Sequence, residues 1–127
     1  MKKKSYITGI NGFTGRYMAS LLSSHGHEVY GLASQRTSKK SDWKICQGNL
    51  LDVETIKSHI SEIKPNYIIH LAGISSVSHE NTELIYRTNL LGTRNLLEAI
   101  PRDKNCPDSI LIASSANVYG NSLVEIL

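Results

Sequence analysis

Eight residues near the amino terminus have the types and the spacing that bind a phosphate group. Residues 8–15 read Thr-Gly-Ile-Asn-Gly-Phe-Thr-Gly, which places a glycine at positions 9, 12 and 15. The apolar run Ser5-Tyr6-Ile7 precedes them, and a helical pattern follows. A buried strand, a glycine turn and a helix start in this order form a cradle for the pyrophosphate of a dinucleotide. The alternative is a strand-to-helix turn without a ligand, because glycine spacing alone is a weak signal.

Each glycine of the loop has a separate expected role. Gly9 permits the tight turn out of the strand, Gly12 lets the backbone approach the phosphates, and Gly15 permits close packing of the helix on the strand. Backbone N–H groups at the start of the helix, together with the helix dipole, favour an anion there. We therefore expect the loop to contact the cofactor through Gly9, Asn11, Gly12, Phe13, Thr14 and Gly15.

Strand and helix patterns alternate along the whole chain, which indicates an α/β fold with a doubly wound parallel sheet. The first strand is expected at the centre of the sheet, with the glycine loop at its carboxyl end, where such sheets bind ligands. One helix begins after Asp52, carries an apolar stripe and ends at Pro65. The other expected elements are strands at Lys4–Thr8, Glu28–Ala33, Trp43–Gln47, Tyr67–Leu71 and Ser109–Ala113, and helices at Phe13–Ser24 and Asn81–Ile100.

Composition excludes several classes of function. The 127 residues carry a net charge of only +3, and the lysine runs 2–4 and 39–40 contain no interleaved aromatic residues, so we expect no nucleic-acid partner. No apolar run approaches the ~18 residues of a membrane helix, and polar residues interrupt the apolar core that a signal peptide needs. Cys46 and Cys106 lie far apart without metal-site spacing. We expect a cytoplasmic protein with reduced thiols and no metal site.

The end of the second strand bears on the choice of cofactor. It reads Ala33-Ser34-Gln35-Arg36 and lacks the acidic residue that would hydrogen-bond the ribose hydroxyls of NAD. Ser34 could donate to the 2′-phosphate of NADP, and Arg36 could pair with it through two N–H groups. The alternative for Arg36 is an exposed loop side chain. We therefore expect NADP in preference to NAD.

Five stretches of the chain together resemble the extended short-chain dehydrogenase/reductases, the NAD(P)-dependent sugar epimerase/dehydratase family. Their order and spacing match the family over nearly the whole chain. The stretch 29–38 is similar to the NADP-binding segment of GDP-mannose 4,6-dehydratases and related GDP-6-deoxy-hexulose reductases. The five stretches are T-G-x-x-G-x-x-G at 8–15, G-N-L-L-D at 48–52, H-L-A-G at 70–73, N-L-L-G-T-R-N-L-L-E-A at 89–99 and S-S-A-N-V-Y-G at 114–120.

The resemblance implies a Rossmann fold, truncated after about five strands, and roles for further residues in binding NAD(P). Asn49, where the family more often has Asp, would border the adenine together with Leu50. Asn89 would hold the active-site end of the sheet, its alternative being an exposed helix residue. His70 is expected as a packed core side chain and not as a base or a metal ligand. The remaining implied cofactor contacts are Leu71, Ala72, Gly73 and Ser114.

Ser115 is the catalytic residue that the resemblance implies, because in this family the hydroxyl before V-Y-G bonds the sugar oxygen that becomes a ketone. It would assist proton transfer while hydride moves to or from the cofactor. Its alternative is a structural serine at a strand end. Ser76 is the expected substrate contact. These roles imply a nucleotide-sugar substrate.

The family's catalytic Tyr-x-x-x-Lys pair does not occur in this chain, since no tyrosine has a lysine four residues later. We therefore expect residues 1–127 to be an incomplete cofactor-binding domain, lacking the substrate-binding region and inactive alone. A non-catalytic dinucleotide sensor or interaction module is the alternative. Apolar residues on more than one face of the helix at 81–100 fit a homodimer interface or simple core packing.

Overall fold

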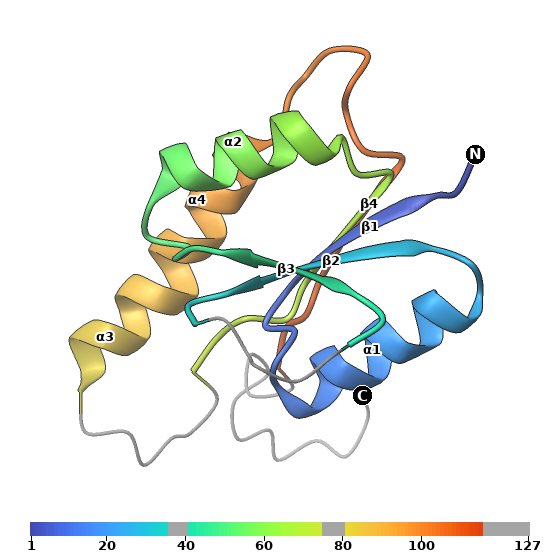
Figure 1. The fold of residues 1–127 in the computed structure, drawn as a ribbon. Helices are drawn as coiled ribbons and strands as arrows, with labels where there is room; N and C mark the ends of the chain where they lie inside the picture. Colours follow the sequence, from blue (N-terminus) through green and yellow to red (C-terminus); the bar gives the residue numbers. More distant parts are fainter. Residues whose placement is uncertain (36–40, 75–80, 116–127) are drawn as a thin grey trace, which may run out of the picture.

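The protein forms one parallel β-sheet covered on both faces by helices (Figure 1). The computed structural model describes residues 1–35, 41–74 and 81–115. The strand order is β3-β2-β1-β4-β5, with every neighbouring pair parallel. This confirms the predicted doubly wound sheet with the first strand at its centre. The strands are β1 Lys4–Thr8, β2 Glu28–Ala33, β3 Lys44–Gln47, β4 Tyr67–His70 and β5 Ser109–Ile112.

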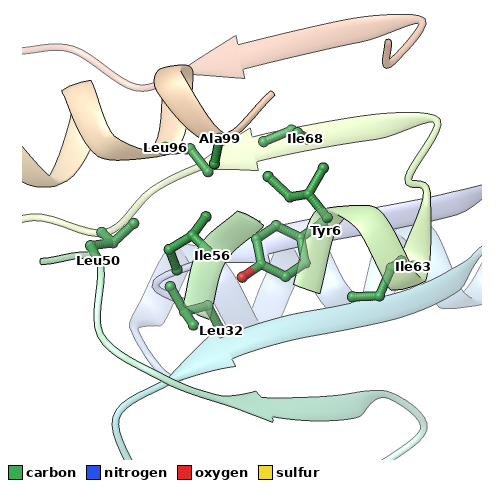
Figure 2. Close-up of a cluster of buried hydrophobic side chains, with 9 residues drawn as sticks. Tyr6, Leu32, Leu50, Ile56, Ile63, Ile68, Leu96 and Ala99 are labelled. Atoms are coloured by element: carbon green, nitrogen blue, oxygen red, sulfur yellow. The ribbon is translucent and has the colours of Figure 1, made fainter. Parts of the chain in front are cut away.

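Two apolar clusters bind the helices to opposite faces of the sheet. Helix α1 (Phe13–Ser24) lies on one face, while α2 (Val53–Ile63) and α4 (Gly92–Ala99) lie side by side on the other (Figure 1). The α1 cluster contains Ile7, Ile10, Ala19, Val29, Ala33 and Ile69. Figure 2 shows the opposite cluster, which contains Tyr6, Leu32, Leu50, Ile56, Ile60, Ile63, Ile68, Leu96 and Ala99.

Alternation along β2 and β4 explains how each strand serves both clusters. Neighbouring side chains of a strand point to opposite faces of its sheet. Val29 and Leu32 of β2 accordingly belong to different clusters, as do Ile68 and Ile69 of β4. β2 and β4 are therefore covered on both faces.

Helix ends follow local capping chemistry. The Asp52 side chain accepts a hydrogen bond from the backbone N–H of Thr55 at 3.2 Å, which starts α2. Gly26, with φ of 82°, lies just past the end of α1, and its N–H donates to the Ser23 carbonyl at 2.9 Å. A positive φ costs glycine little, and α1 ends at Ser24 as predicted.

The helix expected at Asn81–Ile100 is not a regular α-helix throughout. It consists of α3 (Thr82–Tyr86), the π-helical segment η1 (Arg87–Leu91) and α4. The N–H of Gly92 bonds to the Arg87 carbonyl five residues back, where an α-helix would bond four residues back. The spacing of apolar residues does not reveal a single widened turn, so the sequence did not predict the π-helical segment. Such turns occur often at functional sites.

Strand β5 is an edge strand of the sheet, and its apolar side chains are exposed. Ile110, Leu111 and Ile112 are 37%, 49% and 44% exposed. These three side chains are thus only partly covered by the described residues. In the described ranges no helix combines the length and the apolarity needed to cross a bilayer.

We expect Ile56→Ala to lower the free energy of unfolding by about 2–5 kcal/mol, because Ile56 is fully buried between α2 and the sheet. Ser58→Ala, on the exposed side of the same helix, should change it by no more than about 0.5 kcal/mol. Urea denaturation followed by circular dichroism measures both. Equal effects of the two substitutions would contradict the placement of this cluster.

Candidate functional site

The glycine loop joins β1 to α1 through contacts that leave no room for side chains. Gly9 has φ of 72°, and a Cβ there would lie 2.7 Å from the backbone nitrogen of Ala72. A Cβ on Gly15 would overlap the carbonyl oxygen of Gly9. Glycine at both positions is therefore required by the fold itself, whether or not a ligand is present.

Gly12 differs from its two neighbours, because the protein does not fill the space beside it. Its φ of −72° suits any residue, and a Cβ there would meet only the Gly9 carbonyl oxygen, at 3.3 Å. Gly12 also forms part of a pocket wall. The absence of a side chain at Gly12 therefore leaves room for a ligand.

The amino terminus of α1, beside this space, carries the partial positive charge of the helix dipole, and no side chain of its own first turn neutralises it. Its N-cap is Gly12, which makes no side-chain capping bond, and its first turn contains no acidic residue. The first N–H groups of a helix lack partners within the helix, and the dipole favours an anion there. Gly12, Phe13 and Thr14 thus fit a pyrophosphate group.

A pocket of about 340 Å³ opens at the carboxyl ends of β1, β2 and β3, next to the loop. Its size suits part of a small-molecule ligand. Seven predicted cofactor residues lie in its wall, contributed by four separate segments of the chain. The lining residues are Gly9, Asn11, Gly12, Leu32, Ala33, Ser34, Gly48, Asn49, Leu50, Ala72 and Thr88.

The other predicted site residues lie outside this wall or outside the described residues. Phe13 is 81% exposed and its ring contacts that of Tyr17. Ser114 and Ser115 are exposed just past β5, whose pairing with β4 continues through Ala113 N–H to the His70 carbonyl at 3.0 Å. Leu71, Gly73 and Asn89 are sequence neighbours of the lining residues Ala72 and Thr88, and Arg36 and Ser76 fall outside the described ranges.

Asn49 lies in the pocket wall, but its amide oxygen already has a donor. The backbone N–H of Leu51 bonds to it at 2.9 Å. A carbonyl oxygen has two lone pairs, so an adenine amino group would be its second donor. This local turn also fixes the orientation of the Asn49 side chain.

Asn89 is exposed, as its alternative interpretation expected, but its side-chain amide is also hydrogen-bonded to the chain after β4. Its amide oxygen accepts from the Ile74 N–H at 2.7 Å, and its amide nitrogen donates to the Ile74 carbonyl at 3.0 Å. A Cβ on Gly73 would lie 3.1 Å from the same amide oxygen. Asn89 therefore holds the chain just after β4, at the carboxyl ends of the strands.

His70 is a buried core residue with a partner at each ring nitrogen. It is 3% exposed, and burial lowers the pKa of its imidazole. Its Nδ1 lies 2.6 Å from Thr8 Oγ1 and its Nε2 lies 2.8 Å from Thr93 Oγ1. These bonds support the prediction of a packed histidine and leave neither nitrogen for a metal.

Sequence reasoning did not single out several residues that build the site. Thr8 accepts from the N–H groups of Leu71 and Ala72 at 3.2 and 3.1 Å. Asn95 donates to the Leu50 carbonyl at 2.9 Å, and Gly92 packs on the Leu50 side chain. Thr88 lies in the pocket wall. Three of these four sit in the stretch 89–99 or beside it, and their polar or small side chains within an apolar helix pattern were the available signal.

Comparisons with known proteins agree with this geometry. The family model described as "NAD dependent epimerase/dehydratase family" matches residues 5–125. GDP-6-deoxy-D-talose 4-dehydrogenase of Aggregatibacter actinomycetemcomitans is 29% identical over 98% of this chain and 39% of its own length. GDP-mannose 4,6-dehydratase of Vibrio cholerae is 31% identical over 79% of this chain and 32% of its own.

Solved structures show the same fold. A proposed epimerase from Burkholderia cenocepacia J2315 matches 98% of this chain and 41% of its own at a TM-score of 0.86 and 34% identity. UDP-glucose 4-epimerase of Thermus thermophilus, solved with NAD, matches 76% of this chain and 33% of its own chain. The TM-score is 0.67 and the sequence identity is 32%. The chain thus spans about two fifths or less of these relatives. With the glycine loop, the pocket and a match over nearly its full length, the chain belongs to the NAD-dependent epimerase/dehydratase family.

Proposed function

We propose that this chain is the cofactor-binding part of an enzyme that moves hydride at a carbon of a nucleotide-sugar, as an epimerase, dehydratase or reductase. The observation that carries the proposal is the uncapped start of α1 beside Gly12, whose missing side chain leaves room on the pocket side. Relatives named for GDP- and UDP-sugars support the substrate class. A bound nicotinamide cofactor would supply a reversible hydride acceptor.

NADP is the cofactor that we propose in preference to NAD. Ser34 lies in the pocket wall at the end of β2, and no acidic residue stands there to accept from the ribose hydroxyls. Arg36, two residues later, would pair with the 2′-phosphate. The related structure from Thermus thermophilus holds NAD, so the two cofactors must be compared directly.

Ser115 is the residue of the described chain that we propose for catalysis. It stands three residues past β5. Because the strands are parallel, it lies on the same side of the sheet as the glycine loop, where the strands have their carboxyl ends. A hydroxyl there would donate to the sugar oxygen and polarise the carbonyl that forms. Ser76 is proposed as a substrate contact from the resemblance alone. The Tyr-x-x-x-Lys pair of the family would have to follow Leu127.

A non-catalytic dinucleotide sensor remains the second candidate, because no tyrosine of residues 1–127 has a lysine four positions later. The reading frame after Leu127 separates the two candidates. A Tyr-x-x-x-Lys motif within the next ~50 residues would end the sensor hypothesis, whereas a stop codon directly after Leu127 would support it.

The oligomeric state and the cellular location of the protein are part of the same proposal. Leu84, Tyr86, Leu90, Leu91 and Leu97, on the segment from α3 to α4, are 39–65% exposed, which favours a homodimer formed through that segment. Both cysteines are unpaired, and NADP(H) is an intracellular cofactor, so we propose the cytoplasm.

Gly12→Ala should weaken cofactor binding and leave the fold intact, because its added methyl group meets only one protein atom but enters the pocket wall. We expect at least a tenfold rise in the Kd for NADPH, or about 1.4 kcal/mol, by fluorescence titration. Gly15→Ala is the matched comparison and should unfold the protein more readily, since its methyl group overlaps the Gly9 carbonyl. Unchanged NADPH affinity in Gly12→Ala would remove the main support for the site.

Ser34→Asp should weaken NADPH binding roughly tenfold or more, because like charges about 4 Å apart cost about 1–4 kcal/mol. NADH binding should stay unchanged or improve, since a carboxylate can accept from the ribose hydroxyls. Ser34→Ala removes only the hydroxyl and should have a smaller effect. Equal losses for NADPH and NADH would contradict the placement of Ser34 at the 2′-position.

Ser115→Ala should lower kcat of the complete enzyme roughly 10²-fold or more, as loss of a proton-transfer partner typically does. Its Kd for NADPH should stay unchanged, and Ser115→Thr should retain part of the activity. Residues 1–127 alone should show no turnover of a nucleotide-sugar. A full-rate Ser115→Ala enzyme would refute the catalytic assignment.

A further inference from the structure

A continuous chain of hydrogen bonds crosses the molecule behind the pocket. It starts at the backbone N–H groups of Leu71 and Ala72, passes through Thr8, His70 and Thr93, and ends at the carbonyl oxygen of Asn89. Four segments contribute: the end of β1, β4 with the residues after it, η1 and α4. The geometry of this chain determines where its protons lie.

The Thr8 end fixes the proton of the first hydroxyl. A hydroxyl oxygen has two lone pairs and one hydrogen. Thr8 Oγ1 accepts the Ala72 N–H at 3.1 Å and the Leu71 N–H at 3.2 Å, and the Leu71 N–H is shared with the Thr8 carbonyl oxygen, also at 3.2 Å. With its lone pairs facing these donors, the hydroxyl hydrogen points to Nδ1 of His70, 2.6 Å away, an arrangement that favours an Nδ1 without a proton.

The Asn89 end reaches the same result independently. A carbonyl oxygen can only accept, so Thr93 Oγ1 donates to Asn89 O at 2.6 Å. Thr93 Oγ1 therefore accepts from Nε2 of His70 at 2.8 Å, and Nε2 carries the proton. Both ends specify one species, the neutral Nε2–H imidazole. Burial of the ring, which lowers its pKa, favours the neutral form too.

This chain connects the two hydrogen-bonded supports of the segment that follows β4. Thr8 holds the segment where it starts, at Leu71 and Ala72. The Asn89 side chain holds it at Ile74, through 2.7 and 3.0 Å bonds. Ala72, at the first support, lies in the pocket wall. The bond between Thr93 Oγ1 and His70 Nε2 ties the helical segment that carries the second support to His70.

We propose that His70, as the neutral Nε2–H tautomer, is a positioning residue that couples the two supports and so sets where Ala72 and Gly73 stand against the cofactor. The inference rests on the proposed function for its effect on binding, but the tautomer and the coupling belong to the protein alone. Neither His70 nor Thr93 lines the pocket. A change at Thr93 therefore reports coupling and not a lost ligand contact.

The tautomer is measured without any cofactor. The full-length protein is labelled with ¹⁵N-histidine, and long-range nitrogen–proton correlation spectra are recorded at pH 7. For His70 they should show an unprotonated Nδ1 and a protonated Nε2. A protonated Nδ1, a fast exchange between tautomers or an imidazolium at that pH would overturn the proposal. This measurement needs no variant, so it stands even if a substitution prevents folding.

The coupling is tested by Thr93→Val, which keeps the shape and removes the hydroxyl, against Thr93→Ser, which keeps the hydroxyl. We expect Thr93→Val to bind NADPH roughly three- to tenfold more weakly, because it loses the hydroxyl bonds to His70 and Asn89, and Thr93→Ser to bind nearly as the wild type. In the cofactor-free protein, the amide signals of Leu71 and Ala72 should shift in Thr93→Val only.

The outcomes separate this inference from the proposed function. Wild-type protein that binds no NADPH or NADH would refute the function, while shifted Leu71 and Ala72 amides in Thr93→Val would still support the coupling. Normal NADPH binding by the wild type with unshifted amides and unchanged affinity in Thr93→Val would refute the coupling alone.

Discussion

The contact between the Gly9 carbonyl and the start of α1 is the constraint on which the rest of the structure depends. Gly15 lies so close to that carbonyl that no Cβ fits between them, and Gly9 itself turns with φ of 72° against the backbone of Ala72. This approach places the first turn of α1 over the carboxyl end of the central strand. The helix N–H groups, the end of β4 and the pocket then lie together at the carboxyl ends of the strands.

The opposite wall of the pocket depends on a single helical segment. Within seven residues, Asn89 holds Ile74, Gly92 packs on Leu50, Thr93 reaches His70 and Asn95 holds the Leu50 carbonyl. These residues begin within η1 and continue into α4, so the widened turn lies beside the contacts that set the wall. The π-helical turn is thus part of how the site is positioned.

Much of the fold was predictable because it follows from local rules. Helix α1 began and ended where predicted, since Gly12 and His25-Gly26 mark its ends in the sequence. The central place of β1 followed from the glycine loop and the alternation of elements. Individual strand ends differed by one residue, as with β4, which ends at His70 and not at Leu71.

The parts that were missed depend on contacts between distant segments. Nothing local to Thr8 indicates that it bonds residues 71 and 72, which lie 63 and 64 positions away. The π-helical turn was likewise invisible to periodicity. Asn49 was predicted as an adenine contact, but its bond to the Leu51 N–H shows only in the structure. Arg36 and Ser76, which bear on cofactor and substrate choice, fall outside the described residues and stay predictions.

The most direct measurement of the central claim is a titration of the ¹⁵N-labelled protein with NADP⁺, followed by its backbone amide signals. If the start of α1 binds the pyrophosphate, the amides of Gly12, Phe13 and Thr14 should shift most and saturate together, because their N–H groups would gain the phosphate oxygens as acceptors. Amides of these three residues that stay unchanged at saturating NADP⁺ and NAD⁺ would contradict the account.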